Sequence, residues 1–502
     1  MHHSSHSHHA PPAGALRRAP PTMAWAAILL TLGGCALQPV YVAPELQAPT
    51  AWSENTPVSY AVFGQPPVDR QAWWRALGDR AIDALTEAAL ADSPTLAQAT
   101  ARMDEARATL GVSAAAHGPT VGASAGLTRA QGQNTANPAS GATALSTSAS
   151  AGPRLSWEVD LFGRVKQSEA AAQSRLDARS ADADSTRLAL VADIANSVLS
   201  LRACENARRV LVNDIASREK TLALTRLRLS TGFAAPVDEA RAASGLAASR
   251  TSLALQDEQC TRLVNALVAL SGQDARTVRQ TVIATEQAAE PSEPVFMPTA
   301  PASVPALPAT VLARHPSVVS AEREVAAAWA EVGVARANRL PRLDLAAVLT
   351  GQWIRAAGSS LDFTTWSLGP SLSGTLFDGG AGAANVSAAE ARYRRAVAGL
   401  QGTLRSTVQE VENALAAQDS ASARAASTQD GVAAARTTLQ ASEAQWKAGA
   451  ISLFELEDSR RQLASAQDAE IAARRDQTQA WVALVKATGG HITSTSENLR
   501  HE

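Results

Sequence analysis

The feature that most constrains this sequence is the stretch 164–229, which contains neither proline nor glycine. As one continuous α-helix, it would extend for about 100 Å. Apolar residues recur along it at multiples of seven, at Ile194, Leu201, Ile215 and Leu222, which is the spacing of helices that pack side by side. Because such a helix cannot bury its apolar stripe inside one ordinary domain, we expect it to pack against other long helices.

The second feature is an internal duplication. Leu90 to Arg129 aligns with Leu312 to Gly351 without a gap. Further matches pair Pro94 with Pro316, Pro119 with Pro341, Gly152-Pro153 with Gly369-Pro370, and Gly232 with Gly449. The sequence therefore predicts one structural unit written twice, over residues 73–272 and 309–490. A Pro-rich linker, 273–308, joins the copies, and residues 491–502 form a tail.

Each copy is expected to hold two strands and three helical segments, with turns at glycine and proline. The first helical segment of the first copy is interrupted at Ser93-Pro94, where serine caps and proline opens a helix. The expected helices are 79–117, 164–229 and 234–271 in the first copy and 309–338, 383–447 and 452–488 in the second. The expected strands are about 119–131 and 150–162, then about 341–353 and 364–377.

The expected strands alternate apolar with polar or small residues. In the first of them Val121, Ala123, Ala125 and Leu127 share one face. Alternation over about ten residues is typical of strands with one face on lipid and the other on water. The same pattern fits an ordinary half-buried sheet, and both interpretations stay open on this pattern alone. No run of 18 apolar residues follows the N-terminal region, so we expect no transmembrane helix.

The N-terminus has the pattern of an export signal. Arg17 and Arg18 precede a short apolar stretch that ends in Leu32-Gly33-Gly34-Cys35. This tetrapeptide resembles a lipobox, which predicts that residues 1–34 are a signal peptide and that Cys35 carries diacylglycerol and an N-acyl chain. The alternative is a chance cysteine after an ordinary signal. A Pro-rich, extended segment follows the cysteine to residue 72. Five histidines (His2, His3, His6, His8 and His9) lie upstream of the cleavage site, and we interpret them as a tag or a misassigned start rather than a metal site.

Other function classes find little support. A net charge of −2 argues against a nucleic-acid partner. The remaining histidines have no metal-ligand spacing, and no nucleophile motif occurs. Gly380-x-Gly382 opens a helix, but Asn385 replaces the third glycine of a dinucleotide loop. We therefore expect no enzyme, no catalytic residues, no metal and no cofactor.

Strand number sets the expected assembly. Four strands cannot close a membrane barrel, because the smallest known barrels have eight. Three chains supply twelve strands and enough long helices to wall a tube, which favours a cyclic homotrimer. The predicted fold class is an α+β membrane protein: a long antiparallel α-helical barrel plus four β-strands per chain in a trimeric 12-stranded transmembrane β-barrel.

Here the sequence resembles a known family, the TolC-like outer-membrane factors, in the NodT-type lipoprotein branch that serves resistance-nodulation-division efflux pumps. The likeness extends over about residues 32–490 and includes the duplication. The segments that carry it are Leu32-Gly33-Gly34-Cys35, Ser156-Trp157-Glu158-Val159-Asp160-Leu161-Phe162-Gly163, Leu376-Phe377-Asp378-Gly379-Gly380 and Lys447-Ala448-Gly449-Ala450-Ile451-Ser452-Leu453-Phe454-Glu455-Leu456. The resemblance implies a trimeric duct with its barrel in the outer membrane. It also implies a periplasmic helical tunnel whose closed tip docks a periplasmic adaptor and an inner-membrane transporter.

The resemblance also implies a gate just after the last helical turn, at Phe454, Glu455 and Asp458. Three copies around an axis would form an apolar plug and a negative ring. The alternative is that these acids are solvated charges that open a helix. The matching first-copy positions are Val237, Asp238 and Arg241, and Arg241 could pair with a neighbour's carboxylate. Adaptor docking is expected at the turns around Gly232 and Gly449, although glycine there also simply permits a tight turn.

Two cysteines are candidates for a disulfide. Cys204 and Cys260 each lie 28 residues from Gly232, so two antiparallel helices joined there bring them to the same height. An exported protein meets an oxidising compartment, which favours a bridge. The alternative is two small buried apolar residues.

The predicted function is the outer-membrane channel of a tripartite efflux pump: a passive homotrimeric exit duct, lipid-anchored in the bacterial outer membrane, with its helices in the periplasm. The expected partners are a membrane-fusion adaptor, a resistance-nodulation-division transporter and outer-membrane lipid. The alternative is a periplasmic, adaptor-type helical protein without pore activity. Such a protein would need only one helical hairpin and no membrane-type strands.

Overall fold

The computed structural model describes residues 40–45, 49–53, 72–133, 143–284, 296–301, 303–305, 308–356, 359–490 and 492–494. The chain divides into two compact units. The strand unit contains residues 115–167 and 333–386, and the helical unit contains 41–114, 168–332 and 387–502. The two copies of the duplication thus contribute to both units and do not form separate domains.

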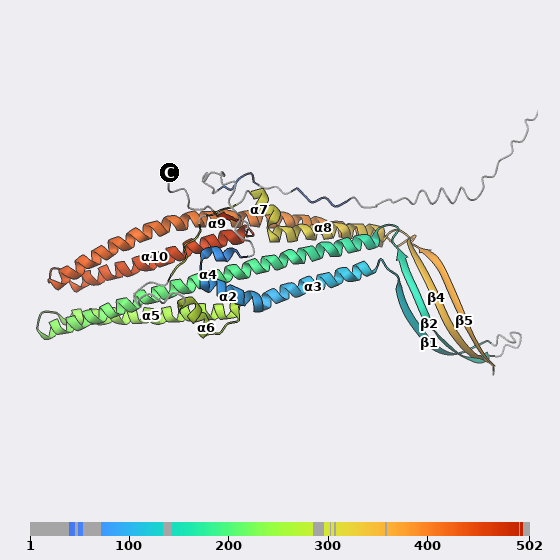
Figure 1. Cartoon of the computed structure of the whole chain (residues 1–502), viewed down its shortest axis with the longest axis horizontal. Coiled ribbons are helices and arrows are strands. Elements are labelled where there is room, and N and C mark those ends of the chain that lie inside the picture. The colour runs from blue at the N-terminus through green and yellow to red at the C-terminus, as the bar shows by residue number, and fades with distance from the viewer. Residues whose placement is uncertain are drawn as a thin grey trace, which may run out of the picture. The chain divides into compact units, whose positions relative to one another are not determined.

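The strand unit is one antiparallel sheet in the order β1-β2-β4-β5 (Figure 1). Its strands are β1 (Thr120–Gln133), β2 (Thr143–Val159), β4 (Arg342–Ala356) and β5 (Ser359–Ser373). β2 begins seven residues earlier than expected, because the segment before position 150 is rich in Ser, Thr and Ala and gives a weak apolar signal. β5 ends at Ser373, not at 377 as expected.

The end of β5 has a local cause. A Cβ on Gly374 would lie 3.2 Å from Pro341, so the residue after β5 lies close to the residue before β4. Asp378 then accepts hydrogen bonds from the N–H groups of Gly380 and Gly382, at 2.8 and 2.6 Å. The bond from Gly382 is the main cause of the lowered pKa of Asp378. The Gly380-x-Gly382 motif therefore opens a capped helix.

β2 passes very close to β4 at Gly152. The register between β2 and β4 is interrupted at Gly152 and Pro153. A Cβ on Gly152 would lie 1.8 Å from the carbonyl oxygen of Leu349, so only glycine fits at this crossing. Gly369, the equivalent glycine of the second copy, has nothing within 4 Å of such a Cβ.

The helical unit contains two long antiparallel hairpins, α4 with α5 and α9 with α10 (Figure 1). Their bounds are α4 (Arg164–Ser230), α5 (Pro236–Ser271), α9 (Ala381–Lys447) and α10 (Leu453–Ala487). α4 and α9 each have 67 residues, and both start within the strand unit. The remaining helices are η1 (Trp73–Leu77), α2 (Arg80–Asp92), α3 (Pro94–Ala115), α6 (Ala275–Arg279) with the π-helical turn Gln280–Ala284, α7 (Pro308–Arg314) and α8 (Pro316–Ala337).

Both copies divide their first helical segment in the same way. The expected helix 79–117 is split at Ser93, and the expected helix 309–338 is split at His315. Proline follows each break and occupies the first helical position of α3 or α8, where its missing N–H costs nothing. None of the described helices is long and apolar enough to cross a membrane.

The main core of the helical unit surrounds a buried ion pair. Asp79 and Arg202 lie 2.6 Å apart, with side chains 0% and 1% exposed. The Asp79 carboxylate also accepts from the N–H groups of Ala81 and Ile82, which caps α2. Trp73 packs on Trp481 beside this pair, with ring centroids 5.8 Å apart.

The expected linker and tail contain a small sheet. β3 (Ser303–Pro305) pairs antiparallel with β6 (Ile492–Ser494). The Pro-rich linker expected over 273–308 and the tail expected over 491–502 thus each contribute one short strand. Three-residue strands are too short to leave a periodic pattern, so the sequence did not reveal them.

The close approach of the two strands at Gly152 gives a test. Gly152→Ala should destabilise the folded sheet by about 1–3 kcal/mol, because the new methyl group overlaps a backbone carbonyl that must move. Thermal unfolding of the purified protein in detergent measures the effect. Gly369→Ala is the matched control and should unfold like the wild type. Equal melting of the two variants would contradict the close approach.

Candidate channel wall and helical tip

The register of the sheet separates its side chains into two different faces. One face, here called the apolar face, holds cross-strand rows such as Val121, Leu155, Ala347 and Leu368. The opposite face, here called the polar face, holds rows such as Thr120, Ser156, Ala346 and Gly369. Val121 and Leu368 are 71% and 65% exposed, so no described segment of the chain covers the apolar face there.

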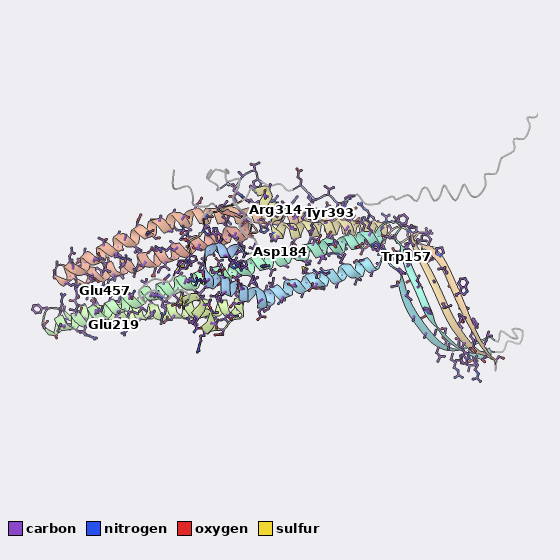
Figure 2. The ribbon with its side chains drawn as sticks, in the orientation of Figure 1. Trp157, Asp184, Glu219, Arg314, Tyr393 and Glu457 are labelled. Atoms are coloured by element: carbon purple, nitrogen blue, oxygen red, sulfur yellow. A yellow bond between two sulfur atoms is a disulfide. The ribbon has the colours of Figure 1, made fainter. Side chains whose placement is uncertain are left out.

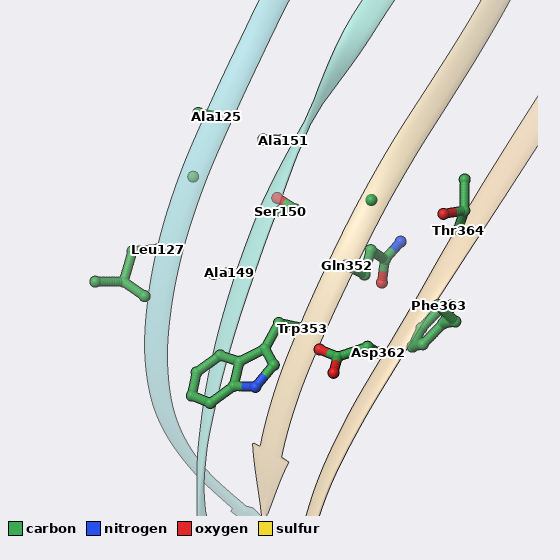
Figure 3. Close-up of a pocket in the computed structure, with 12 residues that line it drawn as sticks. Ala125, Leu127, Ala149, Ser150, Ala151, Gln352, Trp353, Asp362, Phe363 and Thr364 are labelled. Carbon is green, nitrogen blue, oxygen red and sulfur yellow. The ribbon is translucent and has the colours of Figure 1, made fainter.

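Three tryptophans lie on the apolar face: Trp157 and Trp353 toward its two ends, and Trp366, opposite Leu349, midway between them. Trp157 pairs with Leu345 near the end of β2 (Figure 2), and its indole N–H donates to the His117 carbonyl at 2.9 Å. Trp353 lies eight residues along β4 from Leu345, a separation of about 26 Å. Its ring reaches from β4 toward β2, close to Asp362 of β5 (Figure 3). An apolar band of about 25 Å with aromatic residues at its borders is the pattern of a membrane-facing strand surface.

The polar face carries charged side chains near the end of β2 that leads into α4 and at the facing start of β4. Glu158 faces Asp344 across the β2–β4 ladder. Arg164 at the start of α4 donates to both carboxylate oxygens of Glu158, at 2.8 and 2.6 Å. Arg154 lies two side-chain positions further along the same face. Water, rather than hydrocarbon, suits this face.

The two outer strands leave the sheet open. β1 and β5 each pair with one neighbour only among the described strands. An open edge presents unpaired N–H and C=O groups, which favour pairing with another strand.

The two hairpin tips share one turn geometry. Gly232 and Gly449 have φ values of 81° and 78°, which is the left-handed region. The N–H of Phe233 bonds the Arg228 carbonyl at 2.7 Å, and that of Ala450 bonds the Gln445 carbonyl at 2.8 Å. These are Schellman turns, and glycine is required at their left-handed position. Phe233 is 85% exposed.

The predicted gate residues lie directly after the second turn, at the start of α10. Phe454 is 57% exposed. Glu455 forms a capping box with Ser452, accepting from the Ser452 N–H at 3.1 Å. Asp458 accepts from Arg461 and Gln462, both at 2.8 Å. Within one chain, therefore, Glu455 caps a helix and Asp458 is paired locally.

The first-copy tip residues behave similarly. Asp238 accepts from the N–H of Ala235 at 3.3 Å, at the start of α5. Arg241 lies 3.9 Å from Asp238 and keeps a largely exposed side chain. The guanidinium of Arg241 therefore remains available to a second carboxylate.

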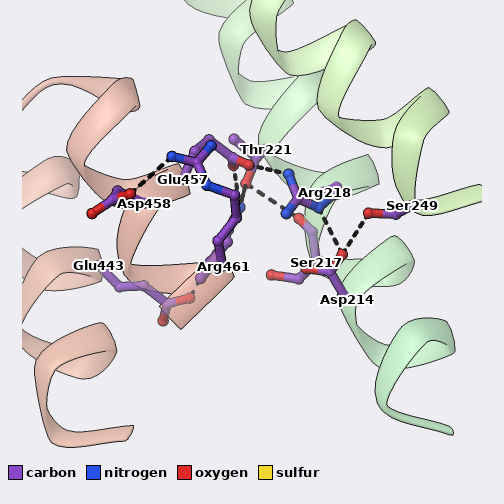
Figure 4. A network of polar contacts seen from close by, with 10 residues as sticks. Asp214, Ser217, Arg218, Thr221, Ser249, Glu443, Glu457, Asp458 and Arg461 are labelled. Atoms are coloured by element: carbon purple, nitrogen blue, oxygen red, sulfur yellow. Dashed lines mark hydrogen bonds and ion pairs between the residues drawn. The ribbon is translucent and has the colours of Figure 1, made fainter. Parts of the chain in front are cut away.

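A buried ionic network behind the tips was not anticipated from the sequence (Figure 4). Arg218 of α4 pairs with Asp214 at 2.7 Å and with Glu457 of α10. Glu457 also accepts from Arg460 at 3.0 Å, and Arg460 donates to Thr221 of α4 at 2.7 Å. The side chains of Arg218, Glu457 and Arg460 are 10%, 12% and 8% exposed. The network thus ties one hairpin to the other.

Apolar packing lies between this network and the turns. Trp446 and Leu456 of the second hairpin pack with Leu222 and Leu246 of the first. The guanidinium of Arg228 lies 4.5 Å from the Trp446 ring centroid, a cation–π contact. Both hairpins of one chain therefore adhere near their tips through apolar and ionic contacts.

Cys204 of α4 and Cys260 of α5 are joined as a disulfide, with Cα atoms 5.6 Å apart. Both are buried at the edge of the main core. Residues 1–34 and Cys35, with the upstream histidines, lie outside the described residues. Among the described residues, no cluster of His, Cys, Asp and Glu could hold a metal ion.

A model of the family described as outer membrane efflux protein matches residues 85–273 and 307–490. The chain belongs to the outer membrane efflux protein family. The resemblance to TolC-like outer-membrane factors is thereby confirmed, and so is the expected location in the outer membrane with helices in the periplasm. The protein is an outer-membrane component of efflux, in a family of channels rather than enzymes.

Similar proteins extend over nearly the whole chain. Nodulation protein T of Rhizobium leguminosarum bv. viciae is 29% identical over 457 residues, covering 90% of this chain and 89% of that protein. The pyoverdine export outer membrane protein OpmQ of Pseudomonas aeruginosa is 29% identical over 476 residues, covering 94% and 97%. The solved outer-membrane channel OprN is 25% identical, with a TM-score of 0.76 over 91% of this chain and 99% of that one. The Campylobacter jejuni CmeC channel shares the fold, with a TM-score of 0.79, 21% identity and coverage of 92% and 96%.

The disulfide gives a test. Free-thiol counting on denatured, unreduced efflux protein should find no free thiol at Cys204 or Cys260, because these two residues are bridged. Cys204→Ser with Cys260→Ser should lower the free energy of unfolding by roughly 2–4 kcal/mol. Reductant should lower the melting temperature of the wild type and leave that of the double variant unchanged. Two free thiols per native chain would contradict the bridge.

Proposed function

We propose that three copies of this chain form a passive exit duct of a tripartite efflux pump. The observation that carries this proposal is the four-stranded sheet, which has one face with a long uncharged apolar band, one polar face and two edges open among the described strands. Pairing β5 of one copy with β1 of the next satisfies both edges and gives a twelve-stranded transmembrane barrel. The apolar faces then meet lipid, and the polar faces line water.

The long helices fit the same assembly. Three copies supply six hairpins, which wall a periplasmic tunnel of antiparallel helices. The rival reading, a periplasmic adaptor-type protein, leaves the apolar face of the sheet unexplained. A soluble protein rarely exposes so large an apolar surface.

The gate of this duct is proposed at the tips. Three copies of Phe454 form an apolar plug, and three copies of Glu455 and Asp458 form a ring that attracts cations. Arg461 lies beside Asp458 and over the Phe454 ring at 6.0 Å, so the ring is partly neutralised in each chain. Asp238 and Arg241 of the first hairpin face the neighbouring copy, and Arg241 pairs with a carboxylate there.

The turns at Gly232 and Gly449 are the proposed docking points for a periplasmic membrane-fusion adaptor, which links the duct to a resistance-nodulation-division transporter. Exposed Phe233 gives the first turn an apolar contact that Ala450 of the second lacks. Lipid on Cys35 anchors the chain to the membrane. Relatives are named for export of pyoverdine, toluene and antibiotics, so the cargo proposed here is small molecules delivered by the partners.

Pore formation is the direct test. Purified protein should migrate as three chains in detergent and produce discrete conductance steps in a planar lipid bilayer. A protein that stays soluble without detergent and conducts no current would refute the duct and favour the adaptor-type alternative.

The gate has its own test. Glu455→Ala combined with Asp458→Ala should raise conductance, reduce cation preference and increase antibiotic leak, because the acidic ring is removed. Ser452→Ala is the matched control, since it removes the same helix cap, at a cost of about 1 kcal/mol, without changing charge. Conductance that rises equally in both variants, or in neither, would count against the acidic ring.

A further inference from the structure

Two arginines lie on the apolar face of the sheet, where charge is otherwise rare. Arg129 of β1 pairs with Thr147 of β2, and Thr147 pairs with Arg355 of β4. The three side chains therefore form one cross-strand row, here called the arginine row. Both arginines are exposed. Because they are two strands apart, their Cα atoms are separated by about 10 Å.

The position of this row is specific. The adjacent row toward the helices contains Leu127, Ala149, Trp353 and Asp362 (Figure 3). The rows between that one and Trp157 carry no charged side chain on the apolar face in the described strands. The arginine row thus begins one side-chain step, about 7 Å, beyond the tryptophan at the border of the uncharged band.

The described structure offers these guanidinium groups no anion. Neither Arg129 nor Arg355 forms an ion pair with a described carboxylate. Asp362, in the neighbouring row, is the one carboxylate on the apolar face of the described strands, and it makes no ion pair with Arg355. The row therefore has net positive charge at the margin of an apolar surface.

We propose that the arginine row binds the phosphate groups of a lipid headgroup in the outer leaflet of the membrane, specifically a bisphosphorylated glycolipid of the lipid A class. This rests on the proposed duct, in which the strand ends remote from the helices face outward. Guanidinium forms paired hydrogen bonds with phosphate oxygens, and two such groups about 10 Å apart match a headgroup with more than one phosphate. Thr147 between them supplies a hydroxyl, and Trp353 packs at the depth where the acyl chains begin.

A need of the Arg129 and Arg355 side chains to reach water does not by itself explain why both arginines lie on the apolar face. The polar face of the same strands is available to charged residues, and Arg154 lies on it. Arginines on the apolar face instead project toward lipid, at the depth where the only abundant anions are headgroups. Charge complementarity thus selects a phosphorylated lipid as the occupant.

The test compares three proteins and three lipids. Wild type, Arg129→Gln with Arg355→Gln, and Arg154→Gln are purified in detergent. Each is titrated with bisphosphorylated lipid A, dephosphorylated lipid A and phosphatidylglycerol, and bound lipid is counted by native mass spectrometry. The wild type should bind bisphosphorylated lipid A most tightly. The double variant should bind it about fivefold more weakly per arginine removed, whereas the polar-face control Arg154→Gln should bind like the wild type.

Three outcomes would overturn the site: unchanged lipid A binding by the double variant, equal binding of the dephosphorylated lipid, or equal binding of phosphatidylglycerol. If the double variant does not fold, each single variant should show the fivefold loss, and a loss in neither would also overturn the site. Bilayer conductance of all three proteins is measured in parallel. Normal conductance with failed lipid discrimination rejects only the lipid site, whereas discrimination without conductance rejects only the duct.

Discussion

The rest of this structure depends on a four-stranded sheet that no described segment covers and whose two edges are unpaired among the described strands. Each strand alternates between a largely apolar face and a polar face, and the outer strands β1 and β5 have edges that no other described strand pairs with. Hydrocarbon tolerates the first face only if every backbone group is paired. The close approach at Gly152, the tryptophans on the apolar face and the charged residues on the polar face all belong to that one two-sided surface. The long helices continue from its strands.

The helical unit meets a different demand, because its hairpins must adhere near their tips without a large core. Trp446 and Leu456 supply apolar contact, and Arg218, Glu457 and Arg460 supply buried charge. Buried ion pairs add little net stability when complete, but removing one partner leaves an uncompensated charge that costs about 3–5 kcal/mol. The ion pairs near the tips therefore add little net stability as a complete set, but removing one partner alone would lower the free energy of unfolding strongly. Such contacts favour two discrete arrangements over gradual deformation.

The sequence predicted the strand pattern, the long helices and the turns because each follows from local rules. Alternation marked β1 and β4, the absence of proline and glycine marked α4, and glycine marked both tips. The ionic network was not predicted because, in the sequence, Glu457 and Arg460 resemble an ordinary surface ion pair between residues three positions apart. A usable signal existed: Leu453, Leu456 and Leu463 are spaced as a packing stripe, and Arg460 occupies the position between them. The partners across hairpins, and the three-residue strands β3 and β6, depend on distant segments that no local pattern encodes.

The disulfide distinguishes the two copies of the duplicated unit. Positions 421 and 477, which match Cys204 and Cys260, hold Ala421 and Gln477, so only the first hairpin is cross-linked. The two cysteines are 56 residues apart in one continuous segment, α4 to α5. The bridge can therefore close as soon as α5 has crossed the inner membrane, before the second copy has been exported. The first hairpin is thus locked by its own residues, whereas the second has no cross-link and is held through its packing against the first.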